Sequence, residues 1–186
     1  MLTARQRELF DALYTSFLSE GFHSFTIDGA VARFHCSKST MYALGTSRDE
    51  IVRRILVTFF KEITRRVDAQ LTGIRSQKTI LETYFSAMTT ALSSASPEFM
   101  RDLATEEVAR PIYELNTVAA NKKISDIIER GVKSGEFSAT SPSFVTLLIQ
   151  HAMEQIQQGD FAATIPFGDA YRELGQLVLH GISAPH

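Results

Sequence analysis

Hydrophobic residues recur at helical spacing along almost the whole chain, and this pattern predicts an all-α protein. The first such run ends at Gly21, a residue typical of a helix C-terminus. Its apolar positions are Leu9, Phe10, Leu13, Phe17 and Leu18. Thr3 and Gln6 have the spacing of a capping box, so we expect the first helix to begin there. After Gln77 no strand-like alternation persists, and we expect no sheet.

Prolines and glycines divide the rest of the chain into further helices. Ser47 and Glu50 form a second capping-box pattern and open a long helix through Leu71. Its apolar face is broad, which indicates burial against two partners. The later helices are expected at 79–94, 98–109, 112–134, 143–158 and 168–181. With three helices before Ser47, the pattern predicts about nine helices.

The stretch 26–44 has the outline of a helix-turn-helix. Ile27, Ala30, Val31 and Phe34 form an apolar stripe on a helix only about two turns long. Ser37 suits the N-cap of a second short helix, 38–43, whose exposed positions are polar. These positions are Lys38, Ser39, Thr40 and Tyr42, whereas Met41 and Leu44 face a core. A small, hydroxyl-rich and basic second helix is typical of a unit that enters a DNA groove.

The residues of this stretch also resemble a known family. The string SKSTMY at 37–42, preceded by TIDGAVA at 26–32 and followed by SRDEI at 47–51, closely resembles the DNA-binding domain of TetR-family transcriptional regulators. The sequence departs from that family's pattern at the turn, which carries His35 and Cys36. It departs again at Gly45, where the family has an aromatic residue. We expect a left-handed glycine cap at Gly45 and the loss of one apolar anchor for the second helix.

The polar face of the second helix and the family resemblance together assign a DNA-binding set. Its members are Thr26, Ser37, Lys38, Ser39, Thr40, Tyr42 and Arg48. Thr26 and Tyr42 are expected to bind phosphate through their hydroxyls, and Arg48 could reach another phosphate. The serines and Thr40 suit either phosphate or a base edge. The alternative for Lys38, Ser39, Thr40 and Tyr42 is an exposed polar helix without a nucleic-acid partner.

The charge distribution changes the picture more than the total charge does. The 186 residues contain 19 Lys and Arg against 21 Asp and Glu, a formal net charge of -2. Residues 1–70 contain 10 Lys or Arg and 8 Asp or Glu, whereas residues 71–186 contain 9 Lys or Arg and 13 Asp or Glu. The expected DNA-binding end is therefore the basic end. The imbalance is modest. Affinity should therefore depend on a few phosphate contacts and on dimerisation.

Composition limits the other classes of protein. With 44% hydrophobic and 22% charged residues, the chain has the balance of a soluble globular protein. No run approaches the roughly 18 apolar residues of a membrane span. A single cysteine forms no internal disulfide and no cysteine-rich zinc site. We expect a cytoplasmic protein that needs no cofactor and has no membrane partner.

The remainder of the chain is expected to bind an effector and to form a dimer. We place the DNA-binding domain at 1–46 and the helical body at 47–186, with the helix 47–71 linking them. The last two helices either form the body's own core or half of an intermolecular four-helix bundle, and the resemblance favours a homodimer. The candidate interface comprises Phe144, Leu147, Leu148, His151, Leu174, Leu177 and Val178. Six side chains of the middle helices could line an effector cavity or an ordinary core: Tyr84, Phe85, Met88, Phe99, Met100 and Tyr113.

The resemblance implies a ligand-responsive regulator, most simply a repressor. It would bind double-stranded DNA at a partly palindromic operator as a homodimer and leave it when a small-molecule effector binds. Two alternatives stay open. His151 and Glu154 are spaced i,i+3 on one helix face, as two ligands of a metal-dependent enzyme would be. A helix-turn-helix fold could also act through protein contacts alone.

Overall fold

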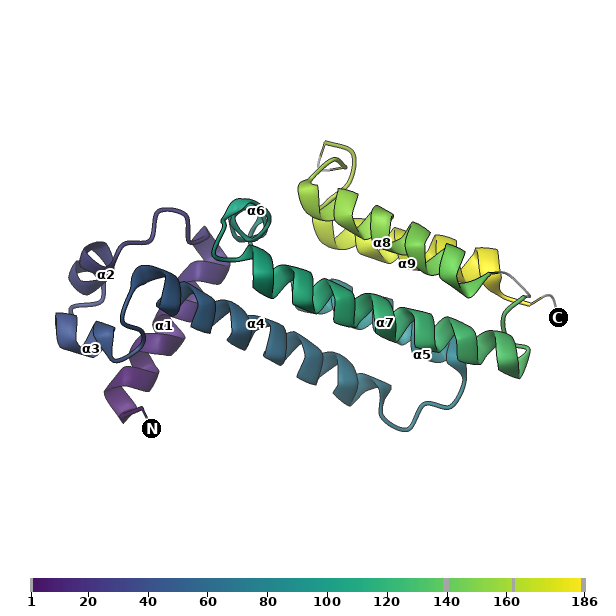
Figure 1. The fold of residues 1–186 in the computed structure, drawn as a ribbon, viewed down its shortest axis with the longest axis horizontal. Helices are drawn as coiled ribbons and strands as arrows, with labels where there is room; N and C mark the ends of the chain where they lie inside the picture. Colours follow the sequence, from purple (N-terminus) through teal and green to yellow (C-terminus); the bar gives the residue numbers. More distant parts are fainter. Residues whose placement is uncertain (1, 139–140, 162, 185–186) are drawn as a thin grey trace. The chain divides into compact units, whose positions relative to one another are not determined.

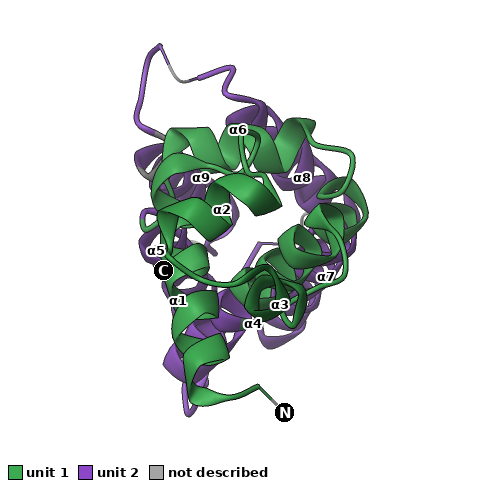
Figure 2. Ribbon diagram, turned by 90° about the vertical axis from the view of Figure 1, so that its left-hand side faces the viewer, with its two compact units in different colours: residues 1–61, 94–114 green, residues 62–93, 115–186 purple. Residues whose placement is uncertain are grey.

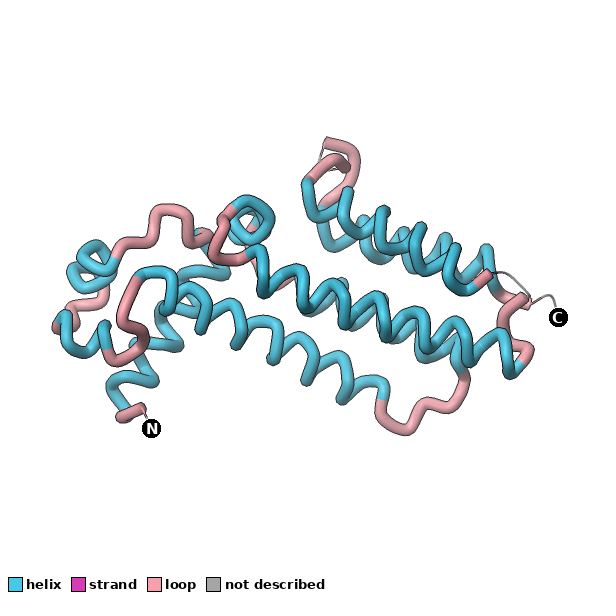
Figure 3. Tube along the Cα trace, viewed as in Figure 1, coloured by secondary structure: helices cyan, strands magenta, loops and turns pink. Residues whose placement is uncertain are grey.

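Nine α-helices follow one another in the part of the chain that the structure describes, residues 2–138, 141–161 and 163–184 (Figures 1 and 3). The structure is a computed structural model. The helices are α1 Ala4–Glu20, α2 Ile27–Arg33, α3 Lys38–Tyr42, α4 Arg48–Leu71, α5 Gln77–Leu92, α6 Pro97–Thr105, α7 Arg110–Ser134, α8 Pro142–Gln158 and α9 Phe167–Ile182. Within the same ranges, β pairing is limited to one isolated bridge between Phe137 and Ser183. The expected all-α class is confirmed.

Side-chain caps fix several helix starts where the sequence places them. The amide of Gln6 donates to Thr3 Oγ1 at 3.3 Å, and the amide of Thr3 donates to Gln6 Oε1 at 2.9 Å, which is a complete capping box. At the start of α4, the amide of Glu50 donates to the Ser47 hydroxyl at 3.2 Å. The carboxylate of Glu50 instead accepts from the amide and hydroxyl of Thr46, at 2.7 and 2.6 Å. The Ser47 half of the second capping box is therefore present, but the Glu50 side chain bonds to Thr46 in place of Ser47.

The helices divide into two compact units (Figure 2). Unit 1 contains residues 1–61 and 94–114, and unit 2 contains residues 62–93 and 115–186. Helix α4 contributes to both units, and α6 belongs to unit 1 although its neighbours in sequence, α5 and most of α7, belong to unit 2. These units describe packing. The functional boundary expected at 46/47 stays a prediction.

An aromatic cluster forms the core of unit 1. The ring of Phe17 on α1 lies 5.7 Å from the ring of Phe22 and 5.0 Å from that of Phe25. The ring of Phe99 on α6 packs edge-on against Phe22 and Phe59, at 5.7 and 4.8 Å. Such geometry adds about 0.5–1.5 kcal/mol per pair beyond simple burial. Helix α6 thereby completes the core that supports the helix-turn-helix.

Unit 2 is built around the packing of α9 on α5 and α8. The N-terminus of α5 is held by Glu136, whose carboxylate accepts from the Ser76 hydroxyl at 2.6 Å and from the amides of Gln77 and Lys78 at 3.0 and 3.2 Å. The Ser76 hydroxyl and these amides lower the pKa of Glu136 to about 2. No helix in the described ranges is both long and apolar enough to cross a membrane.

Candidate nucleic-acid interface

Two serine- and threonine-capped helices form the candidate DNA-reading unit. The Thr26 hydroxyl oxygen accepts from the amide of Gly29 at 3.1 Å at the start of α2. The Ser37 hydroxyl oxygen accepts from the amide of Thr40 at 3.1 Å at the start of α3. Between the helices, His35 has φ 47°, in the left-handed region that favours glycine. The turn thus requires a backbone conformation that glycine adopts most easily, although histidine occupies it here.

The outer face of α3 gathers polar groups on five residues. Ser37 Oγ lies 2.8 Å from both Ser39 Oγ and Thr40 Oγ1, so three hydroxyls form one cluster. Lys38 Nζ is 2.7 Å from Asp28 Oδ1, and this hydrogen bond is the main cause that raises the pKa of Lys38. Tyr42 is 46% exposed. Such groups can donate to phosphate oxygens or to acceptors on base edges.

Arg48 lies in a different environment from the rest of the expected DNA-binding set. Its Nε donates to the carbonyl of Phe25 at 3.0 Å, and its Nη2 donates to the carbonyls of Phe22 and His23 at 3.1 and 3.2 Å. The same Nη2 lies 3.5 Å from Glu106 Oε2. With its donors directed at the chain itself, Arg48 is suited to hold the turn between α1 and α2 rather than to bind phosphate.

The expectation of a left-handed cap at Gly45 is wrong, because Gly45 does not have a positive φ. A Cβ at this position would lie 2.9 Å from both the amide nitrogen and Cγ1 of Ile51. Glycine is required by the close approach of α4, and an aromatic side chain would not fit. Met41 and Leu44 are fully buried, and Arg54 Nη1 donates to the carbonyl of Leu44 at 3.0 Å. The end of α3 is therefore held by other contacts.

One residue that the sequence analysis missed is Asp102 on α6. Only 4% of Asp102 is exposed, and its Oδ2 accepts from the amide of Phe22 at 2.6 Å and from the amide of His23 at 2.8 Å. No local pattern marks this residue, because its partners lie about 80 positions away along the chain. A second missed contact joins α2 to α1, where Arg33 donates twice to Glu20, each time at 2.6 Å.

The six residues expected to line an effector cavity fall into both units. Tyr84, Phe85 and Met88 lie on α5 in unit 2, and burial raises the pKa of Tyr84 to about 12. Phe99 and Met100 are buried on α6 in unit 1, and Tyr113 lies in the first turn of α7 within the same unit. Phe99 belongs to the aromatic core. The assignment of the six to one cavity stays a prediction.

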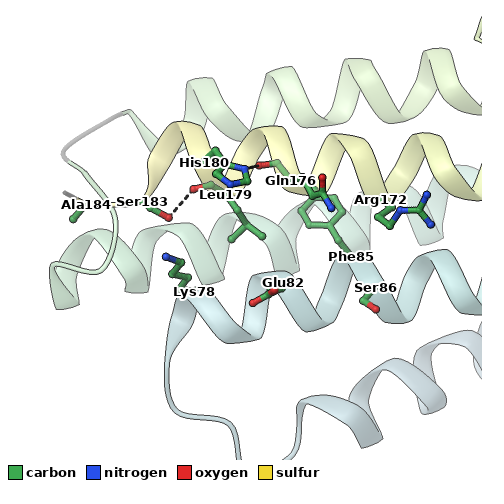
Figure 4. Close-up of a pocket in the computed structure, with 11 residues that line it drawn as sticks. Lys78, Glu82, Phe85, Ser86, Arg172, Gln176, Leu179, His180, Ser183 and Ala184 are labelled. Carbon is green, nitrogen blue, oxygen red and sulfur yellow. Dashed lines mark hydrogen bonds between the residues drawn. The ribbon is translucent and has the colours of Figure 1, made fainter. Parts of the chain in front are cut away.

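Unit 2 contains a groove of about 600 Å³ between α5 and α9 (Figure 4). Phe85 is the one member of the expected set that lines it. Its charged rim includes Lys78, Glu82 and Arg172, and Leu179 points from α9 toward α5. The groove thus combines an apolar wall with both signs of charge, a mixture that can orient a small ligand.

The candidate dimer residues lie on α8 and α9 within unit 2. Phe144, Leu147, Leu148 and Leu177 are exposed to between 50% and 72%. His151 is also exposed, and Leu174 and Val178 are half-buried. The first four side chains are large apolar groups in contact with solvent, as a subunit interface requires of a separate subunit. Their role in a dimer stays a prediction.

The candidate metal pair has other partners. His151 Nδ1 lies 3.0 Å from the carbonyl of Leu147, and Glu154 accepts from the side-chain amide of Gln150 at 2.9 Å. Across the described ranges, no group of three or more His, Cys, Asp or Glu side chains is placed to hold a metal ion.

Together these features define a class of protein: an all-α chain with a helix-turn-helix whose second helix presents hydroxyl and basic groups to solvent. The chain has the fold of TetR-family transcriptional regulators. A TetR-family regulator from Agrobacterium tumefaciens superposes with a TM-score of 0.77 at 12% identity, over 97% of this chain and 98% of that one. A putative transcriptional regulator from Saccharomonospora viridis, solved in complex with choline, gives 0.77 at 14% identity over the same shares.

The sequence itself is similar to one curated protein, the uncharacterized HTH-type transcriptional regulator YfiR of Bacillus subtilis. The two are 24% identical over 145 residues, which cover 74% of this chain and 70% of that protein. No family model matches the sequence. The resemblance to TetR-family regulators that the stretch 26–51 suggested is confirmed at the level of the fold.

Proposed function

We propose that this chain is a ligand-responsive transcriptional repressor that binds a partly palindromic operator as a homodimer. The observation that carries the proposal is the outer face of α3. Its side chains offer three clustered hydroxyls, an ammonium and an exposed phenol, while Met41 turns inward to the core. A helix of five residues gains little stability by itself, so its order comes from this inward anchor. The outward groups lie on the surface, where DNA can exchange for their present partners.

Dimerisation through α8 and α9 follows from the apolar surface on those helices. Phe144, Leu147 and Leu148 recur at i, i+3 and i+4 on α8, so they share one face. On α9, Leu177 adds a large apolar side chain that is 72% exposed. A second copy would cover these groups by the isologous contact that a twofold axis creates. The two helix-turn-helix units of the dimer would then bind successive major grooves about 34–36 Å apart.

Release by a small molecule is the third part of the proposal. Helix α4 follows α3 in the chain and contributes to both units. A ligand in unit 2 that changes the position of α4 would therefore also affect the helix-turn-helix. The neighbour from Saccharomonospora viridis, solved with choline, is a precedent for a small ligand on this fold. An effector needs only a different affinity for the DNA-bound and released conformations to shift the equilibrium between them.

The test is salt-dependent binding to the DNA fragment upstream of the chain's own gene, measured by fluorescence anisotropy. We expect Lys38→Ala to weaken binding and to reduce the log-log salt slope by about one per half-site. Tyr42→Phe should weaken binding without a change of slope, because it removes a neutral hydroxyl. Lys122→Ala is the matched control, since Lys122 is also exposed and paired with an aspartate but lies on α7 in unit 2.

Two results would count against the proposal. If both α3 variants bind like the wild type at low and high salt, α3 does not contact DNA. If the wild type itself shows no salt-dependent binding to any fragment near its gene, the helix-turn-helix acts through another partner, such as a protein.

A further inference from the structure

A pair of acidic residues on and just after α6 holds the turn that leads into the helix-turn-helix. The buried carboxylate of Asp102 accepts both amides of Phe22 and His23 through one oxygen, at 2.6 and 2.8 Å. Gly21, with φ +79°, precedes them, and a side chain there would collide with the same oxygen. Glycine in this conformation lets the backbone reach the carboxylate. Both the conformation of Gly21 and the buried carboxylate of Asp102 therefore favour this contact.

Glu106, the residue that ends α6, holds the same turn by a second route. Its Oε2 lies 3.5 Å from Arg48 Nη2, and its Oε1 lies 2.5 Å from His23 Nδ1. Arg48 in turn donates to the carbonyls of Phe22 and Phe25. Asp102 therefore satisfies amides of the turn, while Glu106 orients the guanidinium that satisfies its carbonyls. Charge-assisted hydrogen bonds of this kind are stronger than neutral ones.

We infer that Asp102 and Glu106 are positioning residues for DNA binding. The turn they hold ends at Phe25, and Thr26 caps α2 at the next position. Helix α2 packs on α3, so fixing the start of α2 restricts the orientation of α3. The inference rests on the proposed function, because it assigns these carboxylates a role in the same DNA-binding site without contact to DNA.

The sign of the effect separates positioning from simple electrostatics. A carboxylate near a DNA-binding surface repels phosphate, so its removal alone should leave affinity equal or higher. If Glu106 orients the turn, its removal should lower affinity instead. Glu107 is the matched control, because it is the adjacent residue, carries the same charge, and forms no ion pair or side-chain hydrogen bond with the described residues.

The experiment compares Glu106→Gln with Glu107→Gln in the full chain, at a temperature where both are folded and have the wild-type oligomeric state. We expect Glu106→Gln to bind the upstream DNA fragment about three- to tenfold more weakly, with an unchanged salt slope. Glu107→Gln should bind as well as the wild type or better. Amide exchange at Phe22 and His23 should accelerate in Glu106→Gln and stay unchanged in Glu107→Gln.

Asp102→Asn provides a second variant of nearly the same shape. It keeps an acceptor oxygen but loses the charge, so we expect the same direction of change in affinity and in exchange at Phe22. Equal affinity of Glu106→Gln and Glu107→Gln, with unchanged exchange, would overturn the inference while leaving the proposed function intact. Absence of salt-dependent binding by the wild type would overturn the proposed function instead.

Discussion

Gly175→Ala tests the packing of α9 on α5, on which unit 2 depends. A Cβ built at Gly175 would lie 2.7 Å from both Cβ and Cγ of Phe85. Phe85 Cβ is attached directly to the α5 backbone, so rotation of the ring cannot relieve this contact and the helices must separate. Overpacking of this kind costs about 1–3 kcal/mol. The higher helix propensity of alanine returns about 0.5–1 kcal/mol.

The net expectation is a loss of about 1 kcal/mol of unfolding free energy, within a range of about 0–2.5 kcal/mol. The central value corresponds to roughly 2–4 °C in Tm for a chain of this length. The assay is thermal unfolding followed by circular dichroism at fixed protein concentration. Gly181→Ala is the control on the same helix, because a Cβ there has nothing within 4 Å. It should leave Tm unchanged or raise it. If Gly175→Ala is stabilising to the same degree as Gly181→Ala, the close approach of α9 to Phe85 is wrong.

Three further predictions concern the dimer and two titrating groups. The double variant Leu147→Glu, Leu177→Glu should be monomeric by light scattering, since each leucine buried in the interface contributes about 1.5–3 kcal/mol to association. Leu115 on α7 is 70% exposed but lies outside the candidate interface, so Leu115→Glu should stay dimeric. The hydrogen bonds of Glu136 lower its pKa from 4.5 to about 2, so the stability that this carboxylate contributes is present above pH 4.5 and is lost as the pH falls toward 2. Glu136→Gln should remove that part of the pH dependence of the unfolding free energy in urea. An unchanged pH dependence would contradict this role of Glu136. Burial raises the pKa of Tyr84 from 10 to about 12, so the unfolding free energy of the wild type should fall between pH 10 and 12. It should fall less in Tyr84→Phe. An equal loss of unfolding free energy in both proteins would argue against the burial of Tyr84.

Most helix boundaries could be predicted from the sequence because their signals are local. Thr3, Thr26 and Ser37 each cap the helix that follows them, at the position expected from hydroxyl residues before apolar periodicity. Gly21 ends α1 with a positive φ, as a C-terminal glycine does. Prolines mark the first turns of α6 and α8. In each case the cause and the effect lie within about four residues.

The sequence is less informative where a residue's role is set by a partner outside its own turn of helix. The conformational freedom of Gly45 predicts a left-handed cap, but the need for glycine comes from the amide of Ile51, which lies too close for any side chain. Arg48 has the charge of a phosphate ligand, and its contact with DNA stays a prediction. Its bonds to three carbonyls of the turn between α1 and α2 appear only in the folded chain.

Asp102 shows most clearly why the local patterns could not reveal the whole candidate site. In sequence it is one acidic residue on a short amphipathic helix, and such residues are usually solvated. Its burial costs free energy unless hydrogen bonds replace the lost water, and the two amides that replace it belong to a turn about 80 residues earlier. A periodicity argument has no access to that pairing. The candidate DNA-facing residues could be grouped from the sequence because most of them share one short helix, whereas the residues that we propose orient this helix meet only in the folded chain.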